Sequence, residues 1–203
     1  MKQALVIYFI LFSTFSYSQN TIMSADSFLV LMDKKNADFI NKPFPEFSAS
    51  TNNKECSNDI IKGKVVFINF WFAACAPCIA EMDELNQLFA RFNHNKKFEF
   101  VSFTFDDSKK IALIKRKFKI GYNVYSLSQD ECYRLNNNNG FPTSIILDSG
   151  GIVKWIHSTD EINKPEIKKY FENKVYPLIA KELQGLPARQ FFSIIFLERK
   201  QFY

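Results

Sequence analysis

Cysteine is scarce in this sequence of 203 residues, which contains four, at positions 56, 75, 78 and 132. Four cysteines are too few to hold a chain of this length together as a disulfide scaffold. Stability has to come from an apolar core, and apolar residues make up 47% of the chain, which is enough to build one. Tryptophan is also rare, with two copies, whereas phenylalanine occurs 23 times. The length suits one domain of ordinary size with short appendages.

Long basic blocks and long apolar runs are also absent. The formal net charge is +5 and is not concentrated in one block, so it gives no reason to invoke nucleic acid as a partner. The N-terminal apolar run from Ala4 to Phe12, which follows Lys2, is too short to span a bilayer comfortably. The sequence also contains no internal repeat.

The N-terminus instead has the layout of a signal peptide. Ser16 and Ser18 occupy the −3 and −1 positions of a cleavage site before Gln19, which predicts a signal peptide over residues 1–18. A retained membrane anchor is the alternative, whereas a lipid anchor would require cysteine at the position of Gln19. Export predicts a periplasmic or otherwise extracytoplasmic location, where disulfides persist unless a dedicated system reduces them.

Four segments are expected along the chain. They are the signal peptide (1–18), an N-terminal extension (19–41), the main domain (42–185) and a C-terminal tail (186–203). Residues 24–40 fit a helix and a strand equally well. The apolar run 191–197 in the tail is too short to cross a membrane, so it packs on the domain or docks on a partner.

The main domain alternates strand and helix patterns. Residues 64–72 (KVVFINFWF) are typical of a strand buried on both faces, and apolar residues then recur at helical spacing from Pro77 to Phe92. Other patterns predict a short strand near 47, a loop or ragged hairpin at 51–59, a strand from 98, a helix over 106–120, a strand from 123, a short helix over 129–135, a hairpin over 143–157 and a closing helix over 163–185 with a kink at Pro177. This order predicts an α/β fold: a mixed central sheet, helices on both faces, and a C-terminal β-hairpin plus helix.

Cys75 and Cys78 lie where the buried strand ends and the helix begins. Unpaired backbone N–H groups and the positive end of the helix dipole face Cys75, which should lower its pKa. The thiolate is the species that attacks a disulfide, and Cys78, one turn further on, is positioned to attack the resulting mixed disulfide. The pair is therefore interpreted as a reversible two-electron switch.

Glu81 follows Cys78 by three residues and lies on the same helix face. A carboxyl group held below the dithiol could relay a proton to or from the sulfur of Cys78, and partial burial would raise its pKa toward the useful range. The alternative is a solvated glutamate in the first helical turn, where the helix dipole favours an acidic residue.

These motifs resemble a known family. The stretch FINFWFAACAPCIAE, followed by GFPT at 140–143 and preceded by KPFPEF at 42–47, is similar to the extracytoplasmic thioredoxin-fold thiol–disulfide oxidoreductases of the TlpA/ResA type. The resemblance covers roughly residues 42 to 184. It implies the thioredoxin fold, disulfide-containing exported proteins as substrates, and a membrane thiol–disulfide protein as electron donor.

The resemblance also implies roles for individual residues. Cys75 becomes the nucleophile and Cys78 the resolving thiol, Glu81 becomes the family's acidic residue, and Pro142 becomes a cis-proline packed against the dithiol. Phe141 presents backbone groups to an extended substrate strand. Independently of the resemblance, Ala76, Pro77 and Trp71 are further substrate-binding candidates. Trp71 is interpreted first as a core residue, and its other possible role is to shield the dithiol from water.

The sequence departs from the family pattern close to the dithiol. Ala74 replaces the usual Trp before the first cysteine, and Ala76-Pro77 fills the dipeptide between the cysteines. Both positions affect the redox potential, so the direction of electron flow stays open. Asn69 stands where cytoplasmic thioredoxins place a buried Asp, which favours Glu81 as the acidic group. The run of asparagines at 136–139 has no counterpart in the pattern.

A zinc half-site would need two further ligands. Cys56, Cys132, His94 and His157 are single and scattered, so neither a metal nor another cofactor is expected. Cys56 and Cys132 either form a structural disulfide after export or remain free buried thiols.

Two alternatives share the fold. A peroxiredoxin-like thiol peroxidase has Pro seven residues before its peroxidatic Cys and Thr or Ser three residues before it, whereas this sequence has Ile68 and Phe72 there. A non-catalytic thioredoxin-fold binding module is the other alternative, and the intact Cys-x-x-Cys argues against it.

Overall fold

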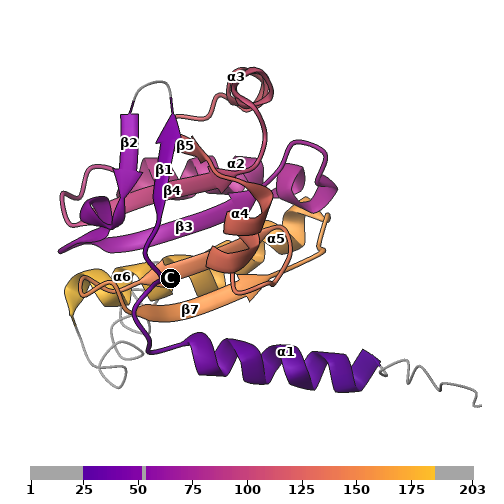
Figure 1. Ribbon diagram of the computed structural model, residues 1–203, viewed down its shortest axis with the longest axis vertical. Helices are drawn as coiled ribbons and strands as arrows, with labels where there is room; N and C mark the ends of the chain where they lie inside the picture. Colours follow the sequence, from indigo (N-terminus) through magenta and orange to yellow (C-terminus); the bar gives the residue numbers. More distant parts are fainter. Residues whose placement is uncertain (1–24, 52–53, 186–203) are drawn as a thin grey trace, which may run out of the picture.

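The computed structural model describes residues 25–51 and 54–185 (Figure 1). The predicted signal peptide and the C-terminal tail lie outside the described residues, so both stay predictions. Within the described part of the chain, no helix is long and apolar enough to cross a membrane.

A seven-stranded mixed sheet forms the centre of the domain, in the order β2-β1-β5-β4-β3-β6-β7 (Figure 1). The strands are β1 (Ser48–Thr51), β2 (Lys54–Ser57), β3 (Val65–Trp71), β4 (Phe98–Thr104), β5 (Asn123–Ser126), β6 (Thr143–Leu147) and β7 (Val153–Ser158). β4 runs parallel to β3 and β5, whereas β6 is antiparallel to β3 and forms a hairpin with β7. The mixed sheet and the C-terminal hairpin are therefore confirmed.

Helices cover both faces of this sheet, as predicted. They are α1 (Ala25–Phe39), α2 (Ala76–Phe92), α3 (Ser108–Phe118), α4 (Gln129–Leu135), α5 (Lys164–Tyr170) and α6 (Tyr176–Gln184). Apolar residues of α2, α3, α5 and α6 share one core with Val65, Phe67 and Trp71 of β3. Those of α4 share the opposite core with Val66, Ile68 and Phe70. All seven residues of β3 are buried because successive side chains enter the two cores alternately.

The closing helix is interrupted before Pro177. A π-helical turn (Phe171–Val175) separates α5 from α6, and the N–H of Tyr176 donates to the carbonyl of Phe171, five residues back. Proline has no N–H to continue the helical ladder, so the extra residue is accommodated immediately before it. At the position of the predicted kink, the structure therefore has one wider, π-helical turn.

The ambiguous segment 24–40 is helical where it is described, and the asparagine run anchors it. The side chain of Asn139 donates to Asn36 Oδ1 at 2.8 Å, Asn137 donates to the same oxygen at 3.2 Å, and Lys35 Nζ donates to the carbonyl of Asn138 at 3.0 Å. Asn137 and Asn138 have φ values of 57° and 52°, a conformation that asparagine tolerates better than most residues. The end of the N-terminal extension therefore contacts the domain directly.

Candidate active site at the Cys75–Cys78 disulfide

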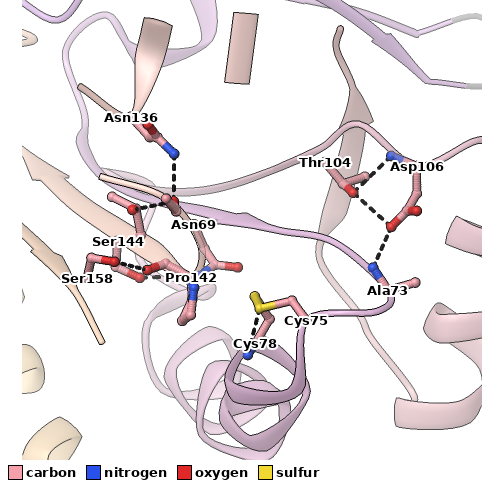
Figure 2. The surroundings of a disulfide bond; sticks show 12 residues. Asn69, Ala73, Cys75, Cys78, Thr104, Asp106, Asn136, Pro142, Ser144 and Ser158 are labelled. Atoms are coloured by element: carbon pink, nitrogen blue, oxygen red, sulfur yellow. Dashed lines mark hydrogen bonds between the residues drawn. A yellow bond between two sulfur atoms is a disulfide. The ribbon is translucent and has the colours of Figure 1, made fainter. Parts of the chain in front are cut away.

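The dithiol lies at the junction of β3 and α2, and the two cysteines form a disulfide (Figure 2). Cys75 is the N-cap of α2, and its Sγ accepts a hydrogen bond from the N–H of Cys78 at 3.2 Å. Pro77 occupies the first turn of the helix, where a missing N–H has no cost. The predicted strand-end and helix-start position is confirmed.

Both cysteines are buried, and their immediate surroundings differ. Cys75 is 5% exposed and Cys78 is 1% exposed, and Cys75 is flanked by Ala74 and Ala76, whose small side chains are both exposed. A partner can therefore approach Cys75 over two methyl groups, whereas Cys78 is covered.

A buried carboxylate holds the loop before Cys75. Asp106 Oδ2 accepts hydrogen bonds from the N–H of Ala73 and from the hydroxyl of Thr104, and the N–H of Asp106 donates to that hydroxyl (Figure 2). Thr104 pairs with Trp71 in the parallel ladder of β3 and β4, so both strands end at the same edge of the sheet. Asp106 is not among the predicted site residues, although its place just after a buried parallel strand is a usable signal.

Replacing Asp106 by Ala is expected to lower the free energy of unfolding by about 2 kcal/mol, because the N–H of Ala73 and the hydroxyl of Thr104 lose their shared acceptor. Urea unfolding of the oxidised protein measures this loss. Asp160, which is exposed, provides the matched control as Asp160→Ala, with a change near zero. Equal losses in the two variants would contradict this role of Asp106.

Pro142 belongs to the loop that faces the dithiol. The Phe141–Pro142 peptide bond is cis, as the resemblance implies, and Figure 2 shows Pro142 in the surroundings of the disulfide. Ser158 Oγ donates to the carbonyls of Pro142 at 2.7 Å and Asn139 at 3.1 Å, which ties this loop to the end of β7. Asn136, fully buried, donates to the carbonyl of Gly140 at 2.7 Å.

Glu81 is buried below the dithiol rather than solvated. It is 6% exposed, and its Oε2 atom has no hydrogen-bond partner in the protein. Burial raises the pKa of this carboxyl group to about 8, because the charged form is poorly solvated. At neutral pH the group is therefore mostly protonated, and its pKa lies in the range needed to exchange a proton with a thiol.

The substrate-binding candidates separate into surface and core residues. Ala76 is exposed, Pro77 is partly buried, and the partly buried ring of Phe141 meets the rings of Phe72 and Phe105, each at 5.4 Å between centroids. The expectation that Trp71 contacts substrate is wrong for this structure. Its indole has no exposed surface and donates through Nε1 to Ser102 Oγ at 2.8 Å, so its role is in the core.

The other two cysteines take no part in the site. Cys56 and Cys132 are both free and buried, so the alternative of a bridge between them is not realised. Burial raises the pKa of each thiol to about 12, which keeps both in the unreactive protonated form. Over the described residues, no group of three His, Cys, Asp or Glu side chains is arranged to hold a metal ion.

This sheet, with a disulfide at the start of a helix and a cis-proline loop beside it, defines a thioredoxin-fold protein of the TlpA/ResA-like thiol–disulfide oxidoreductase class. The chain belongs to the Redoxin family, whose characteristic sequence matches residues 40–172.

Named relatives support this class. The thiol-disulfide oxidoreductase ResA of Geobacillus kaustophilus is 27% identical over 113 residues, which cover 55% of this chain and 64% of the relative. The chain thus spans slightly less than two thirds of that protein. ResA of Geobacillus thermodenitrificans is 26% identical over 142 residues (69% of this chain, 80% of the relative), and the thioredoxin-like protein YneN of Bacillus subtilis is 31% identical over 117 residues (56% and 68%).

Solved structures agree on the fold. A Chlorobium tepidum protein assigned as the thiol:disulfide interchange protein DsbE superimposes with a TM-score of 0.60 at 22% identity, covering 69% of this chain and 97% of that one. A thiol-disulfide oxidoreductase from Bacteroides fragilis gives a TM-score of 0.52 at 21% identity, with coverages of 63% and 98%. At these identities the match establishes the thioredoxin-like fold and nothing finer.

Proposed function

We propose that this protein reduces disulfides of exported proteins by dithiol–disulfide exchange through Cys75 and Cys78. One observation carries the proposal: the two cysteines are joined in a disulfide at the N-terminus of α2, with the Sγ of Cys75 accepting the N–H of Cys78. The same hydrogen bond and the helix dipole would stabilise a thiolate on Cys75 in the reduced protein.

The reaction begins with attack of the Cys75 thiolate on one sulfur of the substrate disulfide. The substrate S–S bond breaks, a mixed disulfide forms, and the first substrate thiolate leaves. In the minority of molecules in which Glu81 is ionised at neutral pH, Cys78 then gives its proton to the Glu81 carboxylate and attacks Cys75 Sγ. The bond between Cys75 and the substrate breaks, the second substrate thiolate leaves, and two electrons have passed from the protein to the substrate.

Glu81 has the role of proton acceptor and donor for Cys78 in this scheme. Its burial and its position one turn after Cys78 support the assignment. The pKa of the carboxyl group, about 8, is close to the pKa of a thiol, so a proton can pass between them in either direction. In the reverse half of the cycle, protonated Glu81 returns the proton to Cys78 as the disulfide is opened.

The surface beside Cys75 has the role of substrate binding. The loop of Phe141 and Pro142 would pair its backbone with an extended segment of the substrate, while exposed Ala76 and partly buried Pro77 leave the approach to Cys75 open. Pro142 therefore acts by positioning the substrate segment over the dithiol.

Location and electron supply complete the proposal. The signal-peptide layout of residues 1–18 supports an extracytoplasmic, periplasmic site of action. There a membrane thiol–disulfide protein would be the electron donor that regenerates the dithiol, because disulfides persist outside the cytosol without such a system.

Equilibration of the Cys75–Cys78 pair with dithiothreitol buffers is expected to give a potential near −270 mV rather than the −120 mV typical of strong oxidants. The spacer Ala76-Pro77 contributes no charged or hydrogen-bonding side chain to hold the thiolate, and strong oxidants depend on stabilisation of their reduced form. The fraction of disulfide, measured by alkylation and mass spectrometry, gives the potential. A value near −120 mV would reverse the proposed direction of electron flow.

A further inference from the structure

An open cavity lies between the end of β7 and α5, and Glu81 is part of its lining. It has a volume of about 460 Å³, and among its lining residues are Glu81, His157, Tyr170 and Lys174. A second cavity, of about 10 Å³, is lined by Glu81, His157 and Tyr170 as well, and also by Pro142. Glu81 and His157 therefore line both cavities, the small one next to the cis-proline and the large one open to the surface.

A route for protons is needed at this position because the carboxyl group of Glu81 is largely buried. Its Oε2 has no partner in the protein, and 6% of the residue is exposed. In the proposed reaction Glu81 gains a proton from Cys78 in one half of the cycle and must end the cycle in its starting state. The small cavity matches the space of a single water molecule, which requires roughly 10–15 Å³.

His157 lines both cavities and packs between two aromatic rings. It lies on β7 opposite Ser144, and its ring stacks on Tyr170 at 4.6 Å between centroids and on Trp155 at 5.6 Å. A neutral, partly buried imidazole can accept a proton at one nitrogen and donate one from the other.

The charges around His157 favour its neutral form. Burial lowers the pKa of the imidazole, and the positive charge of Lys174 lowers it further. Tyr170, with its pKa raised to about 12 by burial, stays protonated in the working range. Tyr122 stays protonated as well, because burial and the charge of Glu81 raise its pKa. The remaining ionisable groups of the large cavity are Glu161, Glu166 and Lys169.

We propose that His157 is a proton-relay residue that connects Glu81 with solvent through the cavity between β7 and α5. This inference rests on the proposed function. After Cys78 has given its proton to the Glu81 carboxylate, that proton passes through a water molecule to neutral His157. The imidazolium then releases it to bulk water, where the departing substrate thiolate takes up a proton. The same path runs backwards when Cys78 is protonated again.

The test is the pH profile of single-turnover oxidation of the reduced full chain by oxidised glutathione, quenched with acid and quantified as disulfide. His157→Phe keeps the aromatic stack but removes both nitrogens, and we expect it to slow oxidation about tenfold at neutral pH. Added imidazole is expected to restore the rate. The chain has two histidines, so His94→Phe, at an exposed position, is the matched control and should leave the profile unchanged.

A second arm keeps His157 in place. Lys174→Met removes an exposed positive charge that disfavours the imidazolium, so the pKa of His157 should rise. The part of the rate-against-pH profile that reports this pKa should therefore move to higher pH by roughly half a unit. If His157→Phe does not fold, the Lys174→Met profile decides the question, because an unshifted profile contradicts the proton relay. If the wild type is active and both variants have its pH profile, the relay is wrong while the proposed function stands. A wild-type chain that fails to reduce insulin overturns the proposed function itself.

Discussion

Replacing Cys75 by Ser is expected to reduce the rate of insulin disulfide reduction by on the order of a thousandfold or more. Serine at this position has no thiolate to attack a disulfide sulfur and cannot form the mixed disulfide. The geometry around the site stays the same, since the hydroxyl can accept the N–H of Cys78 that the sulfur accepts now. The loss therefore measures the sulfur chemistry rather than the fold.

Two further variants make this experiment specific. Ala74→Ser places a serine at the exposed position next to Cys75 and leaves the sulfur intact, so this variant should retain nearly full activity. Cys78→Ser should accumulate a mixed disulfide with the substrate, because the resolving thiol is absent. Mass spectrometry of the non-reduced protein detects this adduct.

The same assay separates the proposed function from its two rivals. Equal rates for wild type and Cys75→Ser would indicate a binding module that keeps the thioredoxin fold without the activity. Rapid consumption of hydrogen peroxide by the reduced protein, lost in Cys75→Ser, would indicate a thiol peroxidase instead. Neither outcome is expected, because Ile68 and Phe72 stand where a peroxidase has Pro and Thr or Ser.

Replacing Glu81 by Gln is expected to remove most of the pH dependence of stability between pH 5 and pH 8 in the oxidised protein. The pKa of Glu81 is raised by burial from 4.5 to about 8, so the folded state binds more protons than the unfolded state across this window. The stabilisation that the folded state gains from the neutral carboxyl group is complete below pH 4.5. It is lost as the pH rises through about 8. At 1.36 kcal/mol per pH unit the loss reaches up to about 5 kcal/mol.

Urea unfolding at a series of pH values measures this effect. The disulfide keeps Cys75 and Cys78 from titrating, so the difference between wild type and Glu81→Gln isolates the carboxyl group. The variant should match the wild type near pH 5 and be more stable than it above pH 8. Asp83→Asn, an exposed carboxyl change two residues away on the same helix, is the control and should leave the slope intact. Parallel stability curves for wild type and Glu81→Gln would show that Glu81 is solvated in solution.

The catalytic consequence of Glu81→Gln follows from the same burial. An amide cannot take the proton of Cys78, so resolution of the mixed disulfide should slow more than its formation. His157→Phe is expected to share this phenotype in weaker form, and the double variant should be no slower than Glu81→Gln alone, because His157 acts through Glu81.

The local sequence determined the elements and the position of the dithiol. The run of β-branched and aromatic residues that became β3, the helical spacing after Pro77 and the Cys-x-x-Cys between them all depend on neighbours within one or two turns. Periodicity and spacing describe such local order fully. The Gly-x-Pro-Thr motif likewise located the cis-proline through its family resemblance.

What each side chain faces was decided by the tertiary structure. Trp71 is interpreted from the sequence as a core residue and also named as a substrate-binding candidate, and its hydrogen bond to Ser102 of β4 places it in the core. Asp106 reaches the loop before Cys75 because β3 and β4 end at one edge of the sheet. His157 shares two cavities with Glu81 because β7 lies beside β6 and packs against α5. Burial, an unpartnered oxygen and a shared cavity depend on segments far apart in the chain. A spacing pattern carries no information on such contacts, so the dithiol could be located from the sequence, whereas its proton environment required the folded structure.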